Sequence, residues 1–199
     1  KGKSVWSTIL KVVIAVATAI AGVVGTARHR GMRVINLIVV HCSATKADRD
    51  FTEQDLEVCH RRRGMNGPGY HFYIRKNGDI KTTRPIEKIG AHARGYNAQS
   101  IGICYEGGIS ERGRPEDTRT VWQKHSLRVL VRTLLVDYPG CKVCGHRDLS
   151  PDLNGNGEIE PEEWVKRVPV LMFRKKNIVN NIYILKRNKT NSLLNLLKY

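Results

Sequence analysis

Acidic side chains are missing from both flanks of this chain: none of its 18 Asp and Glu residues lies in residues 1–31 or 169–199. The flanks carry 5 and 7 basic residues, whereas residues 32–168 carry 22 basic and 18 acidic ones, a net charge of 22 − 18 = +4. Most of the formal net charge of +16 therefore lies outside the centre of the chain. Because no RNA- or DNA-binding motif accompanies this charge, it does not indicate a nucleic-acid partner.

The sequence also lacks a long apolar run. Val12–Ala27 spans 16 residues without a charge, whereas a membrane-spanning helix needs roughly 20 apolar residues. Flanked by basic residues, this run is typical of an export signal or a membrane anchor, so we expect membrane contact through residues 9–27. A buried helix is the alternative. Met32 is a candidate native start, in which case residues 1–31 are an upstream extension.

Cysteines are few and odd in number. The chain has 5, none after Cys144, and an odd count argues against a disulfide framework. Cys141 and Cys144 have zinc-like spacing but no second pair to complete a site. Cys42, Cys59 and Cys104 are expected in a strand, a helix and a strand.

The centre of the chain predicts a mixed α/β fold. Apolar runs and alternation predict the strands, and Asn77-Gly78 predicts a hairpin turn. Thr52 is a candidate helix cap, and Pro139-Gly140 should end a second helix. We therefore expect a single mixed central sheet flanked by helices, with 32–168 as the domain. The expected strands are Val34–His41, Tyr70–Arg75, Asp79–Arg84, Ser100–Glu106 and Lys142–Gly145, and the expected helices are Thr52–Arg63 and Arg119–Tyr138.

Five motifs occur in order along this domain. Together they resemble the type 2 N-acetylmuramoyl-L-alanine amidases, a family that includes bacteriophage lysozyme-amidases and peptidoglycan recognition proteins. The resemblance covers Val34 to Trp164. The motifs are His41-Cys42-Ser43-Ala44-Thr45, Gly69-Tyr70-His71-Phe72, Gly90-Ala91-His92-Ala93-Arg94-Gly95-Tyr96-Asn97, Ser100-Ile101-Gly102-Ile103-Cys104 and Gly145-His146-Arg147-Asp148.

The resemblance implies a zinc enzyme that cleaves the amide between the lactyl group of N-acetylmuramic acid and L-alanine in peptidoglycan. His41 and His146 would be zinc ligands, each with its other ring nitrogen held by an acceptor. Tyr70 would be the active-site tyrosine. His71, its neighbour, should face the other way and be structural.

The third of these motifs is a Gly-rich loop that follows the predicted hairpin. His92, Arg94 and Asn97 lie in it and are candidate substrate-binding residues. The alternative is a loop held by its own local hydrogen bonds.

Two positions depart from the family pattern. Phage-type members carry a catalytic lysine six residues after the second histidine, where this chain has Asp152. Asp152 is therefore a candidate general base without the lysine's charge. The third zinc ligand of the family is a cysteine shortly after His146, and here the corresponding segment reads Val168-Pro169-Val170-Leu171-Met172-Phe173.

The segment that begins at Asp152 has a second interpretation. Asp152 to Glu163 matches the 12-residue EF-hand calcium loop position by position, with Gly157 at the sharp turn. An acidic surface turn is the alternative. We therefore consider Asp152 a calcium ligand first. The other expected calcium ligands are Asn154, Asn156, Glu158, Glu160 and Glu163.

The last 31 residues contain 6 Asn and no Gly. We hypothesise that a single-base frameshift near Arg167 replaced the zinc cysteine with Val168 and left 169–199 out of frame. The alternative is a natural basic tail that binds an anionic membrane or wall polymer.

These inferences lead to two candidate functions. The first is a zinc-dependent amidase, impaired by the lost ligand, with structural Ca²⁺ and peptidoglycan as its partner. The second is a non-catalytic peptidoglycan-binding module. A monomer is expected, in the bacterial cell envelope or in the cytoplasm before phage lysis.

Overall fold

The structure is a computed structural model that describes residues 33–164. The predictions made for residues 1–31, Met32, Val168 and the tail 169–199 lie outside the described residues. Within them, every helix and strand expected above is present, with shorter bounds for several strands.

Five strands form one mixed sheet in the order β4-β3-β5-β1-β7. The three central pairings, β3 with β5, β5 with β1 and β1 with β7, are parallel, and β4 is antiparallel to β3. The expected single mixed sheet is therefore confirmed. The strands are β1 (Leu37–Cys42), β3 (Phe72–Ile74), β4 (Ile80–Thr82), β5 (Ser100–Tyr105) and β7 (Lys142–Gly145).

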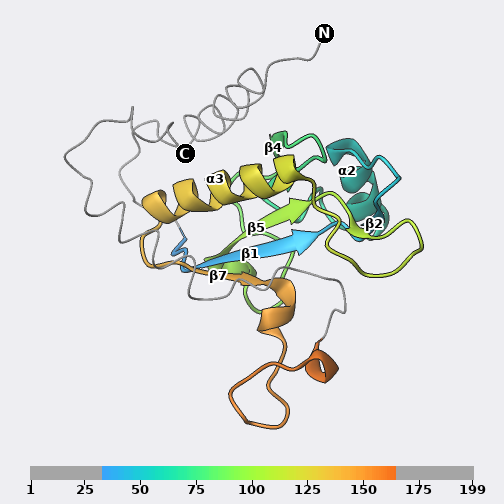
Figure 1. Cartoon of the computed structure of the whole chain (residues 1–199). Coiled ribbons are helices and arrows are strands. Elements are labelled where there is room, and N and C mark those ends of the chain that lie inside the picture. The colour runs from blue at the N-terminus through green and yellow to red at the C-terminus, as the bar shows by residue number, and fades with distance from the viewer. Residues whose placement is uncertain (1–32, 165–199) are drawn as a thin grey trace, which may run out of the picture.

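Alternation along the strands gives the sheet two different faces. Ile38, Val40 and Cys42 of β1 belong to the larger apolar cluster, which packs against Leu127, Leu130, Val131 and Leu134 of α3 (Val121–Asp137). The other face carries a smaller cluster, in which Tyr73 and Cys104 pack against Phe51 and Leu56. Figure 1 shows α3 lying along one face of the sheet. The residues between those of the large cluster, His41 among them, therefore face away from α3.

The helices α2 and α3 each begin at a residue that satisfies one of the first free amides. Thr52, the cap that the sequence predicts, begins α2 (Glu53–Arg62) in a capping box with Asp55. Thr120 begins α3 in a capping box with Gln123. Gln123 is fully buried and donates from Nε2 to the carbonyls of Ile74 and Glu106, 3.1 and 2.9 Å away. This amide joins α3 to the ends of β3 and β5.

Two features differ from expectation. The third strand begins at Phe72, so Tyr70 and His71 precede it instead of opening it. A second, two-stranded parallel sheet, β2 (Thr45–Lys46) with β6 (Gly108–Ile109), was not predicted. Two-residue strands show no periodicity, so the sequence carries no signal for them. The segment after β7, orange in Figure 1, projects from the body of the fold.

Candidate active site

The pairing register of β1 and β7 brings two histidines together. Val40 pairs with Gly145 in adjacent parallel strands, so the next residues along, His41 and His146, come side by side. Their ring centroids lie 4.8 Å apart. His41 is 3 % exposed, at the end of β1, and His146 opens a short 3-10 helix, His146–Leu149. The expected histidine pair is therefore present at one end of these two strands.

Tyr70 completes this group from a separate segment. Its ring centroid lies 4.9 Å from that of His41. Burial, with smaller contributions from the Cys104 and Cys42 thiols, raises the pKa of the Tyr70 phenol well above its ordinary value of 10. The phenol therefore stays protonated at neutral pH and can donate a hydrogen bond.

His92 lies behind His41. It is 7 % exposed, and its Nδ1 is 3.1 Å from Nε2 of His41. Burial lowers the pKa of His92 to about 3, with the neighbouring His71 and His146 acting in the same direction, so the ring is neutral. The structure thus gives His92 a buried partner, and the substrate contact expected from the sequence stays a prediction.

The loop around His92 is held by its own hydrogen bonds. Oδ1 of Asn97 accepts the backbone N–H groups of His92 and Ala93, at 2.9 and 2.8 Å. Asn97 is half-buried, whereas Arg94 is exposed. For Asn97 the geometry favours the local-hydrogen-bond alternative, and of the three expected substrate residues Arg94 is the exposed one.

His71 makes backbone contacts on both ring nitrogens. The Gly102 N–H donates to Nδ1 at 2.9 Å, and Nε2 lies 3.0 Å from the Lys88 carbonyl, to which it donates. Burial lowers the pKa of His71 to about 4, against the opposing effect of the Lys88 carbonyl. The contacts are those of the structural histidine that the sequence predicts.

Sequence reasoning missed His60. It lies on the buried side of α2, one turn after Leu56. Its Nδ1 accepts the N–H of Gly69 at 3.0 Å, and its ring centroid is 5.4 Å from that of Tyr70. The Gly69 carbonyl also accepts from Ala91 N–H at 2.9 Å. His60 therefore fixes the residue before Tyr70. The sequence signal that could have predicted a buried His60 is its spacing of four residues from Leu56, which places both on one helix face.

Comparison with known proteins agrees with this geometry. A family model described as N-acetylmuramoyl-L-alanine amidase matches residues 30–161. The chain belongs to this family. It is an amidase, a hydrolase of an amide bond. A second model, described only as a family of unknown function, matches residues 1–27.

Bacteriophage proteins are among the relatives of this amidase. It is 40% identical over 114 residues to an endolysin of Klebsiella phage KP32, and 39% identical over 114 residues to an endolysin of Escherichia phage T7. Each alignment covers 57% of this chain and 76% of the relative. A solved structure, the endolysin amidase LysCS from Clostridium intestinale URNW, has a TM-score of 0.51 at 37% identity, covering 65% of this chain and 79% of that one.

The described side chains of the amidase include two candidate zinc ligands, His41 and His146. Two imidazoles side by side suit zinc, which prefers nitrogen and sulfur ligands. Within residues 33–164, however, no group of three or more His, Cys, Asp or Glu side chains is placed to hold a metal ion. Cys42 and Cys104 belong to the two apolar clusters. The described residues therefore fit two of the three ligand positions that the family implies.

The Asp152–Glu163 loop of the amidase is organised by its own side chains. Asp152 accepts the N–H groups of Gly155 and Gly157, each at 2.7 Å, and Gly157 has φ +86°. Glu163 is 8 % exposed and accepts from Leu153, Asn154 and Glu160 N–H. These contacts occupy Asp152 inside the loop and leave the expected general-base role untested.

The end of this loop returns to the histidines. Trp164 follows Glu163, and its ring lies 4.4 Å from the Arg147 guanidinium carbon. Arg147 is adjacent to His146 and largely buried. The loop therefore ends against the residue that follows His146.

Proposed function

We propose that this chain hydrolyses the amide between the lactyl group of N-acetylmuramic acid and L-alanine in peptidoglycan, with His41 and His146 as zinc ligands and Tyr70 as the active-site hydrogen-bond donor. The observation that supports this most directly is the convergence of these three rings, from β1, the segment before β3 and the segment after β7, with His41 centroid distances of 4.8 and 4.9 Å.

The chemistry follows from the states of these side chains. When bound, zinc supplies Lewis acidity that polarises a carbonyl and lowers the pKa of water. The Tyr70 phenol, kept protonated by burial, donates to the oxygen on which negative charge develops as the amide carbonyl is attacked. His60, through Gly69, holds the phenol's segment in place. Arg94, exposed in the loop after His92, is a candidate for contact with an anionic group of the stem peptide.

The missing third ligand bears on how active this chain is. Position 168, where the family pattern places a cysteine, is Val168, and it lies outside the described residues. Two imidazoles alone hold zinc weakly and leave additional positions to solvent. We therefore propose an amidase whose zinc affinity is reduced, and keep the frameshift near Arg167 as its hypothetical cause.

Metal analysis combined with muropeptide digestion tests this function. We expect about one zinc per chain at saturation and release of free stem peptide. Val168→Cys should raise zinc retention during dialysis and speed the release, whereas Val170→Cys, which adds a thiol two residues further on, should do neither. If Val168→Cys gains neither zinc nor activity, the ligand-loss hypothesis is wrong.

A non-catalytic peptidoglycan-binding module is the second candidate. The observation in its favour is that Val168 stands where the family pattern places the third ligand, a cysteine. In this case the full chain would bind muropeptides without releasing stem peptide, with or without added zinc, and Val168→Cys would restore hydrolysis.

We also propose that the Asp152–Glu163 loop binds calcium. In support, Gly157 adopts at position 6 the positive φ that the EF-hand turn requires, and Glu163, at position 12, is buried and points into the loop's own backbone amides. Calcium would replace these amides as the partner of the carboxylates. Because Trp164 lies on Arg147, an ordered loop would also fix the chain's path beside His146.

We also propose where the chain is produced and acts. Relatives named endolysins come from bacteriophages, which favours production in the cytoplasm before lysis of the cell wall, with wall turnover in the envelope as the alternative. No helix within residues 33–164 is long and apolar enough to cross a membrane. Membrane contact through residues 9–27 and a monomeric state stay predictions.

A further inference from the structure

We infer that His92 is a positioning residue that holds His41 in the Nε2–H tautomer, so that Nδ1 of His41 carries the lone pair available to a metal ion. This inference rests on the proposed role of His41 as a zinc ligand. It assigns His92 to a buried hydrogen-bond chain, in place of contact with the substrate.

The hydrogen bonds of Ser100 determine which nitrogen of His92 carries the proton. Oγ of Ser100 lies 2.7 Å from the Tyr96 carbonyl, which can only accept, so the Ser100 hydroxyl proton is used there. Nε2 of His92 lies 3.4 Å from the same Oγ. Because the hydroxyl proton is already donated, Oγ acts as the acceptor in this pair, and the His92 proton is on Nε2.

The proton position on His92 determines the proton position on His41. With its proton on Nε2, a neutral His92 presents a lone pair at Nδ1, which lies 3.1 Å from Nε2 of His41. Nε2 of His41 must then be the donor. The chain runs in one direction, from His41 to His92 to Ser100 to the Tyr96 carbonyl, and it defines which nitrogen of His41 is left without a proton.

The His92 ring is closely packed. A Cβ atom added at Gly90 or at Gly102 would lie 2.5 Å from Cδ2 of His92. The ring is therefore packed against two glycine backbones, one in its own loop and one in β5. Gly102 is itself fixed by its N–H bond to His71, and the His92 backbone by Asn97. These contacts fix the plane of the ring, and the hydrogen bonds of its two nitrogens set which edge faces His41.

The arrangement has a functional consequence. A metal-binding imidazole whose second nitrogen is held by an acceptor is oriented in advance and is more basic, and loss of such an acceptor typically costs 10- to 100-fold in metal affinity. His92 provides this acceptor while staying out of contact with the substrate. It should therefore act on the metal affinity and on the orientation of His41, with no effect of its own on substrate binding.

The test uses three variants of the full chain. His92→Leu removes the acceptor, and His92→Asn keeps an amide oxygen close to the Nδ1 position. His125→Asn, in the half-buried part of α3, controls for loss of a histidine. Zinc affinity is measured by competition with a chromogenic chelator, and the His41 tautomer is measured by ¹⁵N NMR of the metal-free protein. Thermal unfolding establishes that each variant is folded.

We expect the Nε2–H tautomer of His41 in the wild-type chain, and a mixture of tautomers in His92→Leu. Zinc affinity should fall about 10- to 100-fold in His92→Leu, recover to within a few-fold in His92→Asn, and match wild type in His125→Asn. If His92→Leu fails to fold, the tautomer of the wild type and the affinity of His92→Asn carry the test.

Two results would overturn the inference: an Nδ1–H tautomer of His41 in the wild type, or an unchanged zinc affinity in a folded His92→Leu chain. A wild-type chain that binds no zinc at all would instead contradict the proposed function. In that case the tautomer measurement, which needs no metal, still decides whether His92 sets the proton on His41.

Discussion

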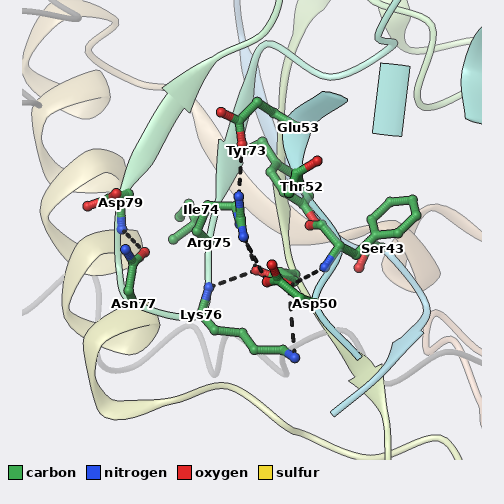
Figure 2. A network of polar contacts seen from close by, with 12 residues as sticks. Ser43, Asp50, Thr52, Glu53, Tyr73, Ile74, Arg75, Lys76, Asn77 and Asp79 are labelled. Atoms are coloured by element: carbon green, nitrogen blue, oxygen red, sulfur yellow. Dashed lines mark hydrogen bonds and ion pairs between the residues drawn. The ribbon is translucent and has the colours of Figure 1, made fainter. Parts of the chain in front are cut away.

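Oε2 of Glu106 lies 3.0 Å from Nε of Arg75, and the Glu106 side chain is completely buried. Arg75 also contacts the Asp50 and Glu53 carboxylates, at 2.7 and 3.2 Å, and Figure 2 shows its side chain among these groups. The other carboxylate oxygen of Glu106 accepts the N–H of Phe51 at 2.7 Å. The Glu106 side chain therefore connects the end of β5 to the segment that leads into α2, the helix that carries His60.

Removing the charge of Glu106 should destabilise the fold strongly. Glu106→Gln removes the negative charge that Arg75 faces and replaces one carboxylate oxygen, which accepts a hydrogen bond, with an amide group that donates. Breaking a buried ion pair typically costs about 3–5 kcal/mol. Asp50→Asn removes a partner whose side chain is 73% exposed, and should cost at most about 1 kcal/mol. Urea unfolding measures both. Equal, small losses for the two variants would show that the buried pair does not stabilise this segment.

Stability should fall with acidity because of His71. Its folded pKa of about 4 lies below the ordinary value of 6.5, so the unfolded chain binds the proton more readily. The neutral, buried His71 therefore contributes its full share to the free energy of unfolding above pH 6.5. This share is lost as the pH falls from 6.5 to 4, and the total loss is about 3 kcal/mol.

Urea unfolding in chelator-treated protein at pH 7.5, 6.0 and 5.0 measures this dependence. His71→Gln should reduce the slope between these pH values, even if it lowers stability throughout, and the part that remains is the contribution of His92, whose pKa burial also lowers. His125→Gln, which keeps His71, should retain the wild-type slope. A slope that His71→Gln leaves unchanged would contradict the assignment.

A methyl group at position 102 should displace His92. The added Cβ of Gly102→Ala would lie 2.5 Å from Cδ2 of His92, and overpacking of this kind typically costs about 1–3 kcal/mol. His92→Ala removes the ring that the methyl group meets. The double variant should therefore show a smaller cost for Gly102→Ala than the wild-type background does, a coupling that a double-mutant cycle measures. Additive costs would place the clash elsewhere.

Calcium should bind the Asp152–Glu163 loop and stabilise the chain. At 100-fold excess over its dissociation constant, an ion that binds only the folded state adds about 2.7 kcal/mol. Calorimetric titration and thermal unfolding should show this for wild type. Glu163→Gln should abolish it, because position 12 supplies both oxygens of one carboxylate. Glu162→Gln changes the exposed neighbouring carboxylate and should bind as wild type does. Calcium heats that persist in Glu163→Gln would locate binding elsewhere.

Much of the fold could be predicted from local patterns. The apolar run predicts β1, and the spacing of the leucines predicts α3. Both predictions work because burial of one or both faces of an element produces a periodic pattern of apolar residues in the sequence. The caps at Thr52 and Thr120 belong to the same class of local information, although only Thr52 was predicted. The pairing of β2 with β6 could not be predicted, because it depends on where two short segments meet after the larger sheet has formed.

The candidate site divides in the same way. The sequence alone indicated the candidate site side chains, His41, Tyr70 and His146, because the motifs that contain them are local properties. The contacts of His60 and His92 were decided by the tertiary structure. A ring nitrogen finds its partner through contacts between segments distant in the chain: Gly69 reaches His60 across a turn, and Gly102 of β5 closes the space around His92. Hydrogen-bond direction depends on these neighbours together, and no single segment of the sequence contains them.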